Sequence, residues 1–231
     1  FRRVRDREIT PEEAIERLAD YPYQDLDFAK IDHHREVRKG FPEVIFGQGK
    51  TDAHIVKIAR EIVRNGGSLL VTRVDETTYK KVKKAIPAAG YNAAGRSIFL
   101  KRGPAAPGRG RVAVLTAGTS DIPVAEEACV TAEMLGNEVD RIYDVGVAGL
   151  HRLLGEYDRI KGARVIICVA GMEGALPSVV AGLFRIPVIA VPTSVAGKQR
   201  SQHELLDLDP LPPLRRGVGS TVLARGKGRG H

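Results

Sequence analysis

Four short segments place polar and small residues where a ligand could be held. The first, Ala117-Gly-Thr-Ser-Asp121, brings a glycine, two hydroxyls and a carboxylate to the start of an apolar helical pattern. Backbone N–H groups and the helix dipole at such a point favour a phosphate or a carboxylate. Ser120 or Asp121 could equally act as a helix cap. The pentapeptide alone leaves both interpretations open.

The second segment, residues 143–152, contains Asp144 directly after an apolar run and His151 and Arg152 on the helix that follows. A histidine exchanges protons near neutral pH, and an arginine binds a phosphate through two hydrogen bonds. A His-Arg pair on a helix is more often plain surface. The role of this pair therefore depends on whether the fold places the other segments next to it.

The third and fourth segments also follow apolar runs. Ala170-Gly-Met-Glu-Gly-Ala-Leu-Pro-Ser178 holds Glu173 close to two glycines, which let backbone approach a ligand closely and favour a functional position for that carboxylate. Val191-Pro-Thr-Ser194 adds two hydroxyls.

The elements that must position these segments alternate between strands and helices. Apolar runs at 112–115, 139–143, 165–169 and 188–191 predict strands, and helical patterns at 124–135, 147–156 and 176–183 lie between them. Such alternation predicts a parallel sheet in a three-layer α/β domain, with ligands at the carboxyl ends of the strands. We therefore expect the four segments to share one pocket.

The N-terminal half has a different pattern. Thr10 and Glu13 have the spacing of a capping box, helices are predicted at 52–65 and 79–86, and strands at 68–73 and 97–100. We expect a small α+β domain over residues 1–100, a Pro- and Gly-rich linker over 101–110, the α/β domain over 111–196 and a divergent, disordered basic tail over 197–231.

Composition excludes several classes of function. Residues 198–231 carry seven basic and three acidic side chains but no aromatic residue to stack on bases, so we expect no nucleic-acid partner despite the net charge of +8. No apolar run approaches the roughly 18 residues of a membrane helix, and the first residues lack a secretory signal, which predicts a cytoplasmic protein without membrane contact. Cys129 and Cys168 fall inside packed elements without neighbouring ligands, which indicates neither a disulfide nor a metal site.

The four segments together resemble a known superfamily, and four longer strings resemble one family within it. The strings are Gly40-Phe-Pro-Glu-Val-Ile-Phe-Gly47, Pro123-Val-Ala-Glu-Glu-Ala128, Ile142-Tyr-Asp-Val-Gly-Val-Ala-Gly-Leu-His-Arg-Leu-Leu154 and Ala170-Gly-Met-Glu-Gly-Ala-Leu-Pro-Ser-Val-Val-Ala-Gly-Leu183. They resemble the pyridinium-3,5-biscarboxylic acid mononucleotide synthases, which begin assembly of the nickel-pincer cofactor of lactate racemase. That family is part of the aminoimidazole ribonucleotide carboxylase superfamily, and the resemblance covers about residues 8–195.

The resemblance implies an enzyme that carboxylates nicotinic acid adenine dinucleotide at C5 of the pyridinium ring and hydrolyses its phosphoanhydride to release AMP. It further implies CO2 or bicarbonate as co-substrate, Mg²⁺ as cofactor and a homo-oligomer, without naming the metal ligands. Glu173, His151 and Asp144 would be catalytic. The substrate-binding residues would be Gly118, Thr119, Ser120, Asp121, Arg152, Gly171, Met172, Gly174, Pro177, Ser178 and Thr193, with Asp32, Arg35 and Arg38 from a charged segment that could also be a solvated face.

The match breaks after Ser194. The family continues with a glycine-rich turn and a helix containing its nucleophilic cysteine, whereas here no cysteine follows Cys168. An aminoimidazole ribonucleotide carboxylase or mutase, which needs no thiol, is therefore a second hypothesis. A non-catalytic module that binds nucleotides, or nucleic acid through the basic tail, is a third.

Overall fold

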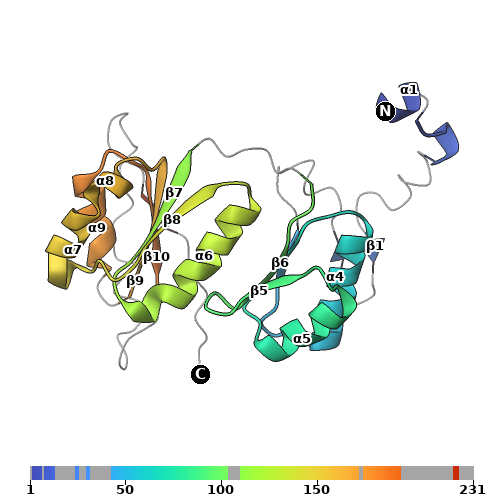
Figure 1. The fold of residues 1–231 in the computed structure, drawn as a ribbon, viewed down its shortest axis with the longest axis horizontal. Coiled ribbons are helices and arrows are strands. Elements are labelled where there is room, and N and C mark those ends of the chain that lie inside the picture. Colours follow the sequence, from blue (N-terminus) through green and yellow to red (C-terminus); the bar gives the residue numbers. More distant parts are fainter. Residues whose placement is uncertain are drawn as a thin grey trace, which may run out of the picture. The chain divides into compact units, whose positions relative to one another are not determined.

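The computed structural model describes residues 2–6, 8–13, 24–25, 30–31, 43–103, 110–171, 174–193 and 221–223. The chain divides into two compact units, residues 1–105 and 106–231, and each has its own sheet and core (Figure 1).

The second unit is built on a parallel five-stranded sheet. Its strands are β7 (Arg111–Thr116), β8 (Glu138–Ile142), β9 (Val165–Ala170), β10 (Val188–Pro192) and β11 (Thr221–Leu223). They lie in the order β11-β10-β9-β7-β8, and every neighbouring pair is parallel. The apolar runs of the sequence form β7, β9 and β10, because strands covered on both faces bury successive side chains. β8 lies at the end of the sheet, and of its residues only Ile142 is buried.

Helices cover both faces of this sheet. On one face α6 (Ile122–Met134) buries Ala125 and Cys129 against Val114 and Val169. On the other face lie α7 (Leu150–Gly155), α8 (Tyr157–Ile160) and α9 (Ala175–Leu183), whose buried side chains share a core with alternate residues of the strands (Figure 1). The predicted three-layer α/β fold is confirmed.

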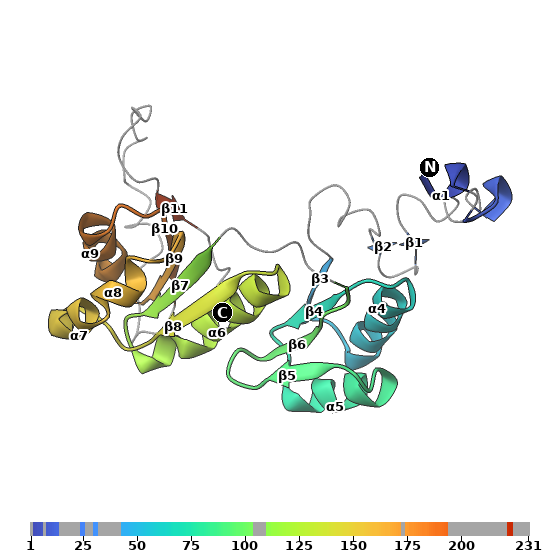
Figure 2. The ribbon, with the colours of Figure 1, turned by 45° about the horizontal axis from the view of Figure 1, so that its top comes forward.

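Two parts of this unit differ from the sequence-based prediction. The helix expected at 147–156 is a 3-10 turn at Val147–Gly149 followed by α7, because the backbone of Gly149 (φ −140°, ψ 64°) leaves the helical region. Residues 221–223, expected in a disordered tail, form β11, which pairs with β10 at the end of the sheet farthest from β8 (Figure 2).

The first unit contains a mixed four-stranded sheet with two helices. The strands β3 (Val44–Phe46), β4 (Leu69–Thr72), β6 (Ser97–Leu100) and β5 (Gly90–Asn92) lie in that order, and only the pair β3 and β4 is parallel. Helices α4 (Asp52–Arg64) and α5 (Glu76–Ala85) share one core with the sheet (Figure 2). A small α+β unit therefore precedes the α/β unit, as predicted.

Shorter elements precede this sheet. They are α1 (Arg2–Arg5), β1 (Gln24–Asp25) and β2 (Lys30–Ile31), of which the two strands pair antiparallel. The predicted capping box is confirmed, since the Thr10 N–H donates to Glu13 Oε2 (2.9 Å) and the Glu13 N–H donates to Thr10 Oγ1 (3.1 Å). None of the helices in the described ranges combines the length and the apolar composition that crossing a membrane requires.

Candidate functional site

The carboxyl ends of β7, β8, β9 and β10 lie along one edge of the second unit's sheet. β7 and β9 are neighbours, yet β7 leads to α6 on one face and β9 leads to α9 on the other. Open α/β sheets bind ligands where connections diverge in this way. Residues 117–121 follow β7, whereas Gly171 and residues 174–178 follow β9, so they flank the divergence and make this point the centre of the candidate site.

Asp121 joins two loops of this edge. Its Oδ2 accepts the backbone N–H of Gly118 (3.1 Å), and its Oδ1 accepts the hydroxyl of Thr193 (2.5 Å). The Thr193 N–H in turn donates to the carbonyl of Ala170 at the end of β9 (3.0 Å). The carboxylate, 3% exposed, therefore caps its own turn and ties the ends of β7 and β10 together. Its predicted contact with substrate stays a prediction.

The remaining polar groups of the first segment face solvent. Thr119 and Ser120 lie in a 3-10 turn (Thr119–Asp121) directly before α6, and both are exposed. Their hydroxyls lie at the point where connections diverge, so this loop can offer both to a ligand.

Asp144 turns the chain at the end of β8 with a left-handed backbone (φ 58°). Its N–H donates to Thr116 Oγ1 (2.9 Å), and the next N–H, of Val145, donates to the Thr116 carbonyl (2.9 Å). The Asp144 carboxylate accepts from the guanidinium of Arg152. Thr116 is completely buried. Sequence reasoning did not single it out, although a threonine closing an apolar run could have indicated such an anchor.

Arg152 and His151 both reach solvent at this edge. The Arg152 ion pair with Asp144 orients a cation that an anionic group could engage. The His151 side chain is exposed on α7.

Gly146 and Gly149 allow the close approach on which this arrangement depends. A Cβ at Gly146 would lie 2.5 Å from the carbonyl oxygen of Ala117, and a Cβ at Gly149 would lie 2.8 Å from the Nε of Arg152. A Cβ at Gly155, on the same segment, would meet no atom within 4 Å.

We expect Gly146→Ala to destabilise the chain by about 2 kcal/mol, because the backbone carbonyl of Ala117 cannot rotate away as a side chain would. Gly155→Ala is the matched control, and its effect should stay within about 0.5 kcal/mol. Urea unfolding of both variants measures the difference. Equal stability of the two variants would show that the backbone at Gly146 and Ala117 moves apart without a loss of folding free energy.

The third segment is described in part. Gly171 and Gly174 close a turn, in which the Gly174 N–H donates to the Gly171 carbonyl (3.1 Å) and Gly174 has a left-handed backbone (φ 62°). Pro177 is buried in the first turn of α9, and Ser178 is exposed. Met172 and Glu173 lie outside the described residues, as do Asp32, Arg35, Arg38 and Ser194.

Both cysteines are completely buried. Burial raises the pKa of the Cys129 thiol to about 11, and its hydrogen bond with Tyr143 acts in the opposite direction. Burial likewise raises the pKa of Cys168 to about 12, and the nearby Asp121 carboxylate adds to the shift. A protonated, enclosed thiol is a poor nucleophile.

Among the described residues, no three His, Cys, Asp or Glu side chains are grouped so that they could hold one metal ion. They therefore do not fit a metal centre held by protein ligands alone.

Comparison with known proteins links this edge to a family. A model of the LarB/PurE-like N-terminal domain matches residues 23–102, and a model of AIR carboxylase matches residues 111–225. An uncharacterized protein of Methanocaldococcus jannaschii is 42% identical over 72% of this chain and 68% of its own length.

Two further relatives each cover about half of the chain. The N5-carboxyaminoimidazole ribonucleotide mutase of M. jannaschii is 33% identical over 49% of this chain and 75% of its own length, and that of Pyrococcus abyssi is 37% identical over 46% and 62%. The combination of the LarB/PurE-like N-terminal domain with the carboxylase domain distinguishes this chain within the superfamily. The chain therefore belongs to the LarB-like members of the AIR carboxylase superfamily.

Proposed function

We propose that the second unit binds nicotinic acid adenine dinucleotide, the substrate that the resemblance implies for carboxylation at C5 of the pyridinium ring and release of AMP. The observation that carries this proposal is that one strand edge of a LarB-like member of the AIR carboxylase superfamily holds exposed Thr119 and Ser120, the Arg152 cation and the turn closed by Gly171 and Gly174. Hydroxyls, a paired arginine and close backbone suit a nucleotide with a diphosphate.

The residues divide the work by their chemistry. Arg152 would bind the diphosphate, and Gly118 with Thr119 and Ser120 would hold the neighbouring phosphate or ribose. His151 and Glu173 would move protons, one at the ring carbon and one at the water that attacks the phosphoanhydride. Mg²⁺ would come with the diphosphate oxygens, whose charge it neutralises.

Carboxylation makes a further demand, because a cationic ring does not attack CO2. A nucleophile must add to the ring and convert the pyridinium into a neutral enamine, whose C5 then forms the new bond to CO2. Loss of the C5 proton and departure of the nucleophile restore the aromatic ring. Neither buried cysteine suits this role. We therefore propose that this chain binds the dinucleotide but does not carboxylate it.

A binding and product assay tests both parts. We expect calorimetry to detect binding of nicotinic acid adenine dinucleotide, and incubation with bicarbonate and Mg²⁺ to yield no dicarboxylated mononucleotide. Absence of dinucleotide binding would overturn the substrate. A pyridinium adduct on either cysteine in mass spectra, or steady formation of the dicarboxylated product, would overturn the proposal that this chain does not carboxylate the dinucleotide.

Thiol labelling tests whether the two cysteines are as unreactive as this proposal requires. We expect iodoacetamide at pH 8 to leave Cys129 and Cys168 unmodified in the native chain and to label both in guanidinium chloride, because the thiolate forms only as the pH approaches about 11 and 12. Intact mass measures the result. Rapid native labelling of either thiol would show that it is reachable and ionised.

A second candidate is an aminoimidazole ribonucleotide carboxylase or mutase. The enclosed thiols favour it, since that chemistry needs none, and two relatives that cover about half of the chain carry the mutase name. The N-terminal unit, which matches the LarB/PurE-like model, favours the dinucleotide. Conversion of N5-carboxyaminoimidazole ribonucleotide without binding of nicotinic acid adenine dinucleotide would select the mutase.

A further inference from the structure

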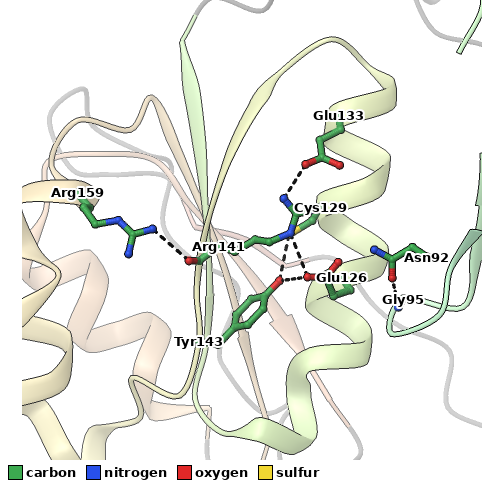
Figure 3. Close-up of polar contacts among 8 residues, drawn as sticks. All are labelled: Asn92, Gly95, Glu126, Cys129, Glu133, Arg141, Tyr143 and Arg159. Carbon is green, nitrogen blue, oxygen red and sulfur yellow. Dashed lines mark hydrogen bonds and ion pairs between the residues drawn. The ribbon is translucent and has the colours of Figure 1, made fainter.

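A partly buried polar network lies on the α6 side of β8, the strand that ends two residues before Asp144. Glu126 of α6, 8% exposed, accepts the hydroxyl of Tyr143 at 2.5 Å and the Nε of Arg141 at 3.0 Å through Oε1. Arg141 also donates through Nη1 to Glu133 at 2.7 Å. Figure 3 shows Tyr143 reaching from the end of β8 to Glu126 on the helix.

Tyr143 donates the hydrogen bond that it forms with Glu126. Burial raises the pKa of the Tyr143 phenol, and the bond to Glu126 raises it further, so the phenol stays protonated and donates. The hydrogen bond to Glu133 raises the pKa of Arg141, which remains a cation. Glu126 therefore receives two donors, one of them charged, and such bonds are stronger than neutral ones.

The residue after Tyr143 is the left-handed Asp144, at a point where the chain crosses the edge of the sheet. Tyr143 packs against the core beneath α6, whereas Val145 belongs to the core on the opposite face. Asp144 thus turns between two anchored neighbours, and its own N–H is fixed by Thr116. A non-glycine residue keeps a left-handed backbone only where its surroundings hold it.

We propose that Tyr143 is a positioning residue for the nucleotide site. Its hydroxyl, held by Glu126, fixes the turn at Asp144, and the Asp144 carboxylate in turn directs the guanidinium of Arg152 toward the substrate's diphosphate. The anion specificity of this edge then depends on a hydroxyl that touches no substrate. The identity of the ligand in this inference rests on the proposed function. The linkage from Tyr143 through Asp144 to Arg152 does not.

Two variants separate positioning from stability. Tyr143→Phe removes the hydroxyl and keeps the ring, while Glu133→Gln alters the same network at the Arg141 end, away from Asp144. The readouts are hydrogen exchange of the Asp144 and Val145 amides, melting temperature, and affinity for nicotinic acid adenine dinucleotide and for inorganic pyrophosphate.

We expect Tyr143→Phe to speed exchange at both amides and to weaken both ligands, each by about tenfold, as loss of one hydrogen bond to a charged group would. Glu133→Gln should change neither the amide exchange nor the ligand affinities, even if its melting temperature differs. In an Arg152→Gln background, Tyr143→Phe should weaken the ligands no further, because its effect passes through that guanidinium.

Unchanged amide exchange in Tyr143→Phe would overturn the first link of the proposal. The second link, from the turn at Asp144 through Arg152 to the ligand, would be overturned if Tyr143→Phe sped amide exchange but left pyrophosphate affinity unchanged. It would also be overturned if Tyr143→Phe lowered the affinity equally in the Arg152→Gln background, or if the wild-type chain bound no pyrophosphate. A wild-type chain that binds pyrophosphate but not the dinucleotide would contradict the proposed function and leave the positioning role supported.

Discussion

Asp121→Ala is expected to destabilise the chain by about 3 kcal/mol, because it leaves the Gly118 N–H and the Thr193 hydroxyl without their shared charged acceptor. The loops after β7 and β10 would lose their tie, so binding of nicotinic acid adenine dinucleotide should weaken at least as strongly. Urea unfolding and calorimetry measure the two effects.

Two comparisons sharpen this result. Asp121→Asn keeps an acceptor for Gly118 and offers an N–H to the Thr193 hydroxyl, so it should retain most of the stability. Asp158→Ala removes a carboxylate that is 86% exposed and pairs with Lys161, and it should change stability by less than about 0.5 kcal/mol. If Asp121→Ala were as stable as Asp158→Ala, the hydrogen bonds that Asp121 accepts from Gly118 and Thr193 would contribute nothing to the free energy of unfolding.

Arg152→Gln is expected to lower the affinity for nicotinic acid adenine dinucleotide about a hundredfold, the effect of removing a charge-assisted bidentate contact. Its melting temperature should hardly change, because the pair with Asp144 is exposed and such pairs contribute little to folding. Arg152→Lys should recover only part of the affinity, since an ammonium lacks the planar fork of the guanidinium.

The matched control for Arg152 is Arg159→Gln. Arg159 is also exposed, also paired with a nearby carboxylate (Glu156), and located on the next helix. Its replacement should leave dinucleotide affinity unchanged. Equal losses in the two variants would point to general electrostatic attraction rather than to a site at Arg152.

The α/β unit was predictable because β7, β9 and β10 appear as apolar runs, which are typical of strands covered on both faces. β8 was predicted although Asp140 and Arg141 interrupt its apolar residues. β7, β8, β9 and β10 were all predicted within one or two residues at each end. β5 was missed because Gly90-Tyr-Asn92 has no apolar alternation, and its glycine is needed where the ring of Phe99 packs against the backbone. α8 was missed because four residues are too few to show a helical period.

The candidate site was predicted as a set of segments but not as a set of contacts. Strand ends carry Asp121, Asp144 and Thr193 to one edge, and topology alone predicts that much. The bond from Thr193 to Asp121 and the anchoring of Asp144 on Thr116 depend on register between distant strands. Local patterns carry no information on that register. The predicted roles of Glu173, Asp32, Arg35 and Arg38 stay predictions.

The tie between Thr193 and Asp121 also bears on the order in which the molecule assembles. Its partners are 72 positions apart, and it closes only when β7, β9 and β10 are already in register. Contacts so distant in sequence form late, after most of the loop-closure entropy has been lost. Weakening the tie should therefore accelerate unfolding while leaving the refolding rate nearly unchanged. The ligand edge would open first when the folded chain fluctuates, and bound nucleotide would slow that opening.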